Sequence, residues 1–140
     1  MQVSLEAFAA EGIEAGLAPD LRRLRKPPTR DKILHAQRTD PTSIAWNAQL
    51  DRGDSVVQLN GEIKKASDGI LVFQSSEETV PLDSCPTYIP PSWRRDIIFY
   101  CHRQKNHARE QRLSEYLSRG HWWPTLQGDV KAPLMNCHFC

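Results

Sequence analysis

The chain has 140 residues, of which 39% are hydrophobic and 25% charged, and its net charge at pH 7 is +1. This length and composition describe one modest globular domain or a small domain with tails, and they exclude a large single core. No stretch reaches the roughly 18 apolar residues of a membrane-spanning helix, and the start of the chain is acidic where a secretory signal is basic. We therefore expect an intracellular protein with reduced cysteines and no membrane partner.

Residues 1–54 are predicted to form a tail and a basic linker. Apolar residues recur at helical spacing near the start, but Gly12 and Gly16 weaken any helix there. The segment 21–38 holds seven basic residues and one acid, and the Pro27-Pro28 pair interrupts helical structure. Such a tract is typical of a solvated connector, and it also suits salt-sensitive, sequence-independent contact with nucleic acid.

Residues 55–88 are predicted to form a short antiparallel β meander. Three short runs, SVVQL, GEIKK and GILVFQ, are separated by the turn dipeptides Asn60-Gly61 and Asp68-Gly69. A meander this small cannot bury enough apolar surface to be stable alone, so we expect it to pack against its neighbours. A proline-rich extended segment then leads to a helix that begins near Ser92, a suitable N-cap.

Three short helices are predicted in residues 89–140. The first has one apolar face, with its charged neighbours Arg94, Arg95 and Asp96 pointing elsewhere; the face consists of Trp93, Ile97, Ile98 and Cys101. The second covers residues 108–119, and its apolar stripe consists of Leu113, Tyr116 and Leu117. The third begins at Trp123-Pro124, and Pro133 either ends it by Ala132 or kinks it.

Three short helices make a poor hydrophobic core, and a domain of this size usually needs a metal ion or disulfides. Two local pairs of metal-ligand residues are present, His102 with His107 and Cys137 with Cys140. About thirty residues separate the pairs, as in structural zinc sites. Residues five apart on one helix point about 140° apart, so the first helix is expected to end between the two histidines. The sequence therefore predicts one structural Zn²⁺ with Cys₂His₂ ligation.

The other cysteines and histidines are interpreted differently. His138 could replace one ligand or be incidental, whereas Cys85 and Cys101 are expected to be core or connector residues. A small thiol enzyme with Cys101 or Cys140 as nucleophile is disfavoured. A nucleophilic cysteine needs a base and an orienting group arranged in space, and a sequence neighbour such as His102 does not provide them.

The stretch 89–140 resembles the HHCC zinc-binding domain of retrovirus-like integrases, particularly those of Ty3/gypsy and related long-terminal-repeat elements. The resemblance is carried by proline and arginine before the first helix, His102, His107, Trp123-Pro124, Asp129-Val130 and the closing Cys137-x-x-Cys140. Upstream, DKILHAQRTDPT and SDGILVFQ are similar to the segment that links ribonuclease H to integrase in such polyproteins. The chain departs from the family at Asn106 and Arg109, where glycines are usual.

We thus predict an α+β protein in which a zinc-stabilised three-helix module (89–140) follows the β meander (55–88) and a largely irregular basic segment (1–54). The resemblance implies the N-terminal module of a retrotransposon integrase, which acts in DNA integration, supports homo-oligomer formation, contacts DNA without sequence specificity, and is nuclear. Between Arg94 and Arg119, seven basic residues against three acids suit phosphate contact.

The integrase catalytic core is expected beyond Cys140. We therefore expect this chain alone not to be an enzyme and to have no small-molecule substrate, because a closed Cys₂His₂ zinc site cannot perform two-metal strand transfer. The alternative is a host-retained module that binds a protein partner through an exposed Trp122 and Tyr116. Binding of a partner without DNA, and without sensitivity to salt, would favour that alternative.

Overall fold

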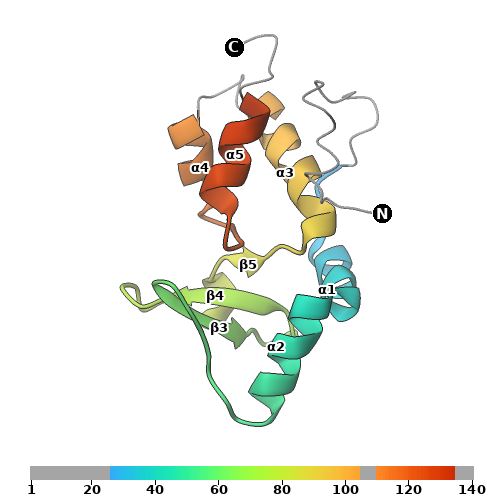
Figure 1. Cartoon of the computed structure of the whole chain (residues 1–140), viewed down its shortest axis with the longest axis vertical. Coiled ribbons are helices and arrows are strands. Elements are labelled where there is room, and N and C mark those ends of the chain that lie inside the picture. The colour runs from blue at the N-terminus through green and yellow to red at the C-terminus, as the bar shows by residue number, and fades with distance from the viewer. Residues whose placement is uncertain (1–25, 105–109, 135–140) are drawn as a thin grey trace. The chain divides into compact units, whose positions relative to one another are not determined.

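A computed structural model describes residues 26–104 and 110–134 of the chain (Figure 1). The chain divides into two compact units. The sheet unit consists of residues 29–90 and 118–123. The helical unit takes its described residues from the ranges 1–28, 91–117 and 124–140. The chain therefore leaves the sheet unit after Pro90 and returns to it between two helices of the helical unit.

The sheet unit begins with two helices, α1 (Arg30–Thr39) and α2 (Pro41–Asp51). Thr29 caps α1 by accepting a hydrogen bond from the backbone N–H of Lys32 at 3.3 Å. Asp40 caps α2 in the same way, with Pro41 in the first turn. The prediction of a largely irregular segment is therefore wrong for residues 30–51. The proline pair precedes α1 instead of interrupting it, and the capping side chains define where both helices start.

The sheet has the strand order β2-β3-β4-β5-β6. Strands β2 (Val56–Gln58), β3 (Gly61–Lys65) and β4 (Leu71–Ser75) form an antiparallel meander, so the predicted meander is confirmed. A 3₁₀ turn, η3 (Leu82–Ser84), leads from β4 toward β5 (Thr87–Tyr88), which pairs antiparallel with β4. The last strand, β6 (His121–Trp122), pairs parallel with β5.

Both predicted turn dipeptides occupy turns for identifiable steric reasons. Asn60 and Gly69 have positive φ angles of 67° and 92°, a conformation that asparagine and glycine tolerate best. Gly61 pairs with Ser75 in the ladder, and a Cβ atom at Gly61 would lie 2.4 Å from the carbonyl oxygen of Gln74. Only glycine fits at that position without a shift of the neighbouring strand.

Strand β6 joins the sheet from a distant part of the sequence. The backbone N–H of Thr87 donates to the carbonyl of Gly120, and that of Ile89 donates to the carbonyl of Trp122, each at 3.0 Å. Neither β5 nor β6 was predicted. A two-residue strand leaves no periodic pattern in the sequence, and a parallel partner more than thirty residues away has no turn signal.

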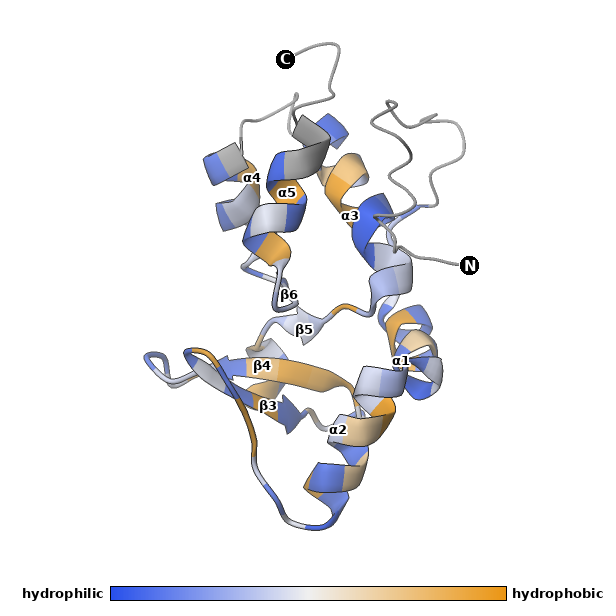
Figure 2. Cartoon of the chain, viewed as in Figure 1, coloured by the Kyte–Doolittle hydropathy of each residue, from blue (hydrophilic) through white to orange (hydrophobic). Residues whose placement is uncertain are grey.

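Two apolar clusters stabilise the sheet unit. On one side Phe73 and Trp122 stack with ring centroids 4.4 Å apart, and Trp46 of α2 meets the ring of Tyr88 edge-on at 4.8 Å. The second cluster packs Leu34 and Leu82 against buried residues, which are Ala66, Ile70, Val72 and Cys85. Figure 2 shows β4 as hydrophobic over much of its length, as expected for a strand that is buried on both faces.

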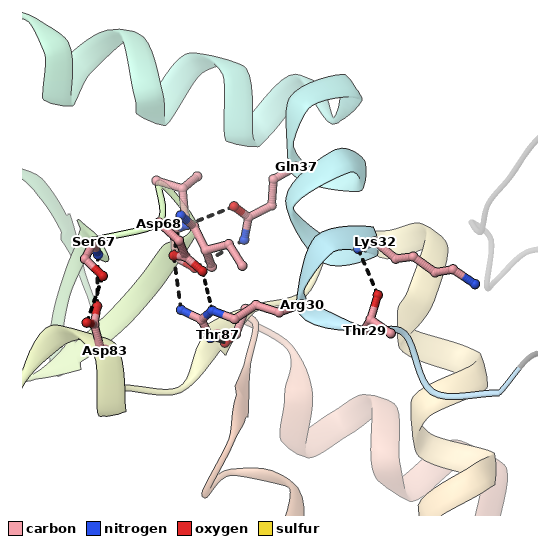
Figure 3. Close-up of polar contacts among 10 residues, drawn as sticks. Thr29, Arg30, Lys32, Gln37, Ser67, Asp68, Asp83 and Thr87 are labelled. Carbon is pink, nitrogen blue, oxygen red and sulfur yellow. Dashed lines mark hydrogen bonds and ion pairs between the residues drawn. The ribbon is translucent and has the colours of Figure 1, made fainter.

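A buried glutamine joins α1 to two strands. Gln37 is 1% exposed, and its Nε2 donates to the carbonyls of Leu71 and Tyr88 at 3.2 and 2.9 Å. Its Oε1 accepts from the backbone N–H of Leu71 at 2.8 Å (Figure 3). The amide therefore satisfies three backbone groups that have no water to bind. Nearby, Arg30 of α1 pairs with Asp68 in the turn before β4 (Figure 3).

The helical unit contains α3 (Pro91–Gln104), α4 (Glu110–Leu117) and α5 (Leu126–Leu134), and each contacts the other two. The α3 helix begins one residue before the predicted Ser92. The α5 helix begins two residues after Pro124 and includes Pro133, so this proline does not end it. Helices and a five-stranded sheet together confirm the α+β class. None of the helices in the described parts of the chain has the length and apolar character to cross a membrane.

Candidate metal centre

Of the four predicted zinc ligands, His102 lies within the described residues. It stands in the last turn of α3. His107, Cys137 and Cys140 lie outside the described residues, and so does the predicted helix end between the two histidines. The arrangement of the four side chains around one ion thus remains a prediction. The structure describes the surroundings of one of them, His102.

The surroundings of His102 are apolar on its own helix. Its side chain is 4% exposed, and Ile98 and Phe99, one turn earlier, are 1% and 8% exposed. Residues three and four apart share one face of a helix, so His102 continues the buried stripe of α3 toward its C-terminal end. A buried imidazole is costly without a polar or metal partner. Its position is that of a residue held inside the helical unit, not of a surface histidine.

Asp96 departs from the sequence-based prediction. We expected it to point away from the apolar face with Arg94 and Arg95, but its side chain is buried and 6% of its surface is exposed. The Arg95 guanidinium lies 3.9 Å from its carboxylate and also lies over the Phe99 ring, 5.8 Å from its centroid. One arginine therefore covers both a buried acid and an aromatic ring. Periodicity alone could not show this because the buried face of α3 is wider than its apolar stripe.

The facing helices contribute the rest of the described core. Leu113 and Leu117 of α4 are 0% exposed, as the predicted apolar stripe of the second helix requires, and Leu126 and Val130 of α5 are at most 4% exposed. Tyr116, which was placed on the same stripe, is 38% exposed. The buried side of α4 is therefore made by Leu113, Leu117 and one residue that the sequence did not indicate.

That residue is Ser114. Its side chain is 3% exposed, and its Oγ finds no hydrogen-bond partner among the described residues. An unsatisfied buried hydroxyl costs about 1–3 kcal/mol, so such groups are rare and need an explanation. Nothing in the sequence singles out Ser114, because a serine in an amphipathic helix is usually solvated.

The described residues do not form a metal site by themselves. Among residues 26–104 and 110–134 there is no group of three or more histidine, cysteine or acidic side chains that could hold an ion. The donor set predicted from the sequence, two thiolates and two imidazoles, suits zinc better than magnesium or calcium, which prefer oxygen ligands. A buried His102 in a helical unit with a small core fits such a set.

The C-terminal part of the chain agrees with a known family. Residues 89–140 match the family model for the integrase zinc binding domain. The resemblance found in the sequence is thereby confirmed at the level of the domain family. The match contains all of α3, α4 and α5, together with the four predicted ligands. Comparisons with curated proteins and with solved structures gave no match.

Two cysteines that were not predicted as ligands, Cys85 and Cys101, lie within the described residues. Cys85 belongs to the sheet unit and is 6% exposed, which confirms the expectation of a core residue. Burial raises the pKa of its thiol, so it stays protonated and unreactive at neutral pH. Cys101 is half-buried on α3. Cys85 therefore lacks the lowered pKa and the exposure that mark a reactive thiol.

The structure also changes the case for a protein-interaction module. That interpretation relied on an exposed Trp122, but Trp122 is half-buried and stacked in parallel on Phe73, with an interplanar angle of 6°. Its ring is part of the sheet unit's aromatic cluster. Of the two side chains proposed for partner binding, Tyr116 is thus the exposed one.

Proposed function

We propose that residues 89–140 are the zinc-binding N-terminal module of a retrotransposon integrase and that His102, His107, Cys137 and Cys140 hold one structural Zn²⁺. The match to the integrase zinc-binding family carries this proposal. The burial of His102 in the last turn of α3 supports it, since a ligand to a structural ion belongs inside the fold.

The ion would stabilise the fold and would take no part in catalysis. Four protein ligands close the coordination sphere, so no position remains for a water or a substrate. His102 would hold the ion from the end of α3, and the cysteine pair would fasten the segment after α5 to it. The module is therefore structural, and any catalysis by the integrase would come from another domain.

The partner that we propose is DNA, contacted without base readout. In the helical unit Arg103 and Arg112 are exposed and Arg94 and Arg95 are half-exposed. Arginines on the surface of a small domain can neutralise phosphates, and the affinity then falls as salt rises. Assembly into a homo-oligomer and action inside the nucleus belong to the same proposal.

The first experiment measures zinc per chain by elemental analysis, together with far-ultraviolet circular dichroism before and after a strong chelator. We expect one zinc ion per chain and a loss of helical signal on chelation. A chain without zinc whose helices resist the chelator would refute the proposal.

DNA binding is tested on the zinc-loaded protein by fluorescence anisotropy with duplexes of unrelated sequence, over a series of salt concentrations. We expect similar affinities for all duplexes and a steep loss of affinity with salt. Zinc binding without DNA binding would leave the module in place and favour the host-retained interaction module, with Tyr116 as a contact.

A further inference from the structure

The exposed face of α1 holds basic residues of the segment 21–38 that the proposed zinc module does not use. On the sheet side of this helix, Ile33 and Gln37 are buried, and Arg30 pairs with Asp68. Figure 3 shows Arg30 and Gln37 pointing toward the sheet and Lys32 pointing away from it. At 100° per residue, the exposed residues of the opposite face fall within an arc of about 120°; they are Asp31, Lys32, His35, Arg38 and Thr39.

The lysines and arginines of residues 29–90 fall into two groups. Those of the first group each form an ion pair with an acidic side chain: Arg30 with Asp68, Arg52 with Asp54, Lys64 with Glu62, and Lys65 with Asp51. The remaining two, Lys32 and Arg38, form no ion pair with any residue in the described parts of the chain. Both stand on the exposed face of α1, with His35 between them. The unpaired lysine and arginine charge of residues 29–90 is therefore concentrated on one helix face.

The spacing of these side chains suits a row of phosphates. Lys32, His35 and Arg38 follow one another at intervals of three residues, so they cover about 9 Å along the helix axis. Each strand of a DNA duplex carries a phosphate about every 3.4 Å along its axis, so this length corresponds to two or three phosphates. Lysine and arginine supply charge, and the imidazole supplies a ring N–H donor. Asp31, the acid on this face, lies in the first turn, where it stabilises the N-terminus of the helix.

The composition of this face distinguishes a phosphate backbone from a protein surface. All of its exposed residues are polar or charged. The exposed large apolar side chains of residues 29–90 lie on other elements; they are Ile44, Val57, Leu59 and Val80. A protein interface normally has an apolar centre from which charged residues are depleted. Lysine and arginine without apolar neighbours instead match the contacts that proteins make with the sugar–phosphate backbone.

We propose that the exposed face of α1 contacts the phosphate backbone of duplex DNA through Lys32, His35 and Arg38, without base readout. For the identity of the partner, this inference rests on the proposed function. It adds a contact surface in the sheet unit, outside the segment 89–140 that matches the integrase zinc-binding family. No zinc ligand is part of this surface.

The test measures binding of the full-length, zinc-loaded chain to a labelled duplex by fluorescence anisotropy over a series of salt concentrations. In the double variant Lys32→Gln with Arg38→Gln, two phosphate contacts are lost. We expect the slope of log affinity against log salt to become less steep by about 1.8, and the affinity at about 0.1 M salt to fall roughly 10- to 100-fold. Glutamine suits a helix about as well as lysine or arginine, so the circular dichroism should stay unchanged.

The matched control is the double variant Arg52→Gln with Lys64→Gln, which removes the same net charge from residues that are already paired. It should keep the slope and the affinity of the unchanged chain.

Three outcomes would overturn the inference, and they differ in what else they refute. If the α1 variant binds the duplex like its control, α1 makes no contact and the proposed DNA contact of the helical unit stands. If the unchanged chain binds no duplex at all, both DNA proposals are wrong, and zinc content still decides the zinc module. If poly-glutamate displaces the duplex at equal charge concentration, the face of α1 binds acidic surfaces in general and is not assigned to DNA.

Discussion

The two units of this protein are stabilised by different means. In the sheet unit, apolar clusters on the sheet, a buried glutamine amide and a ladder of backbone hydrogen bonds leave few groups unsatisfied. In the helical unit, three short helices bury a narrow core that also includes Asp96, His102 and Ser114. The sheet unit is therefore stabilised mainly by apolar packing and backbone hydrogen bonds, whereas the described core of the helical unit is smaller and includes a larger share of polar side chains. The proposed zinc ion would add the stabilisation that such a small core lacks.

The largest effect is expected from removal of a proposed ligand. Cys137→Ser should abolish zinc binding and the helical signal of residues 89–140, because the binding free energy of a structural zinc ion is folding free energy. Elemental analysis and circular dichroism measure both. Cys85→Ser, in the core of the sheet unit, is the control and should keep one zinc per chain. Retention of zinc and helicity in Cys137→Ser would remove this cysteine from the site.

Acid should unfold the helical unit at a higher pH than the sheet unit. Zinc needs both cysteines as thiolates and both histidines neutral, so lowering the pH protonates the ligands and releases the ion. We expect helicity of the helical unit and bound zinc to fall together in an acid titration, while the tryptophan fluorescence of the aromatic cluster persists to lower pH. If the tryptophan fluorescence changed at the same pH at which zinc and helicity are lost, the two units would not differ in their dependence on the metal.

The buried amide of Gln37 is expected to contribute to the free energy of unfolding of the sheet unit. Gln37→Ala would leave two carbonyls and one N–H buried without partners, at a cost of roughly 3 kcal/mol. Urea unfolding followed by fluorescence measures the change in the free energy of unfolding. Arg38→Ala, exposed on the same helix, should change it by less than about 0.5 kcal/mol. Equal effects of the two changes would show that the amide contributes little.

Substitution of Trp122 tests whether its side chain stabilises the sheet unit or is free to bind a partner. Trp122→Ala removes the ring stacked on Phe73, and we expect a loss of about 2 kcal/mol from the unfolding free energy of the sheet unit. Tyr116→Ala, at an exposed position, should cost much less. Chemical denaturation of the two variants side by side gives the answer. An unchanged stability in Trp122→Ala would restore it as a candidate for partner contact.

The smallest effect concerns the ion pair between Arg30 and Asp68. The hydrogen bond from the Arg30 guanidinium lowers the pKa of Asp68 below its ordinary value. Its contribution to stability is therefore present above a pH of about 4 and is lost as the pH falls through the lowered pKa of the folded protein. Both side chains are about two-fifths exposed, 42% and 41%, and solvent screening keeps the contribution below about 1 kcal/mol. Asp68→Asn should flatten the acid limb of stability against pH by this small amount.

Features that depend on residues close together in the sequence were easier to predict than contacts between distant parts of the chain. The meander and its turns were predictable because Asn60, Gly61 and Gly69 act on their immediate neighbours. The helices at 30–51 were not predicted because the basic composition of residues 21–38 is typical of a solvated linker, although two capping residues, Thr29 and Asp40, mark where the helices start. The sequence could not show that Trp122 stacks on Phe73, because this contact depends on a parallel strand pair.

The candidate site shows the same limit. Two histidines and two cysteines at a characteristic spacing predicted a zinc centre, and the family match agrees with that pattern. Spacing says nothing about the side chains that surround the ligands. The sequence could not show that Ser114 is buried without a hydrogen-bond partner among the described residues, because burial depends on how the helices pack.

The parallel pairing of β5 with β6 bears on how this domain can be moved between proteins. The family match begins at residue 89, just after β5 ends at Tyr88, while β6 lies inside the match. A recombination event or a truncation at that boundary would carry β6 away from the strand to which it is bonded and would expose Trp122 to solvent. In this chain the segment that keeps β6 paired is therefore longer than the matching segment, because its partners Thr87 and Tyr88 precede residue 89.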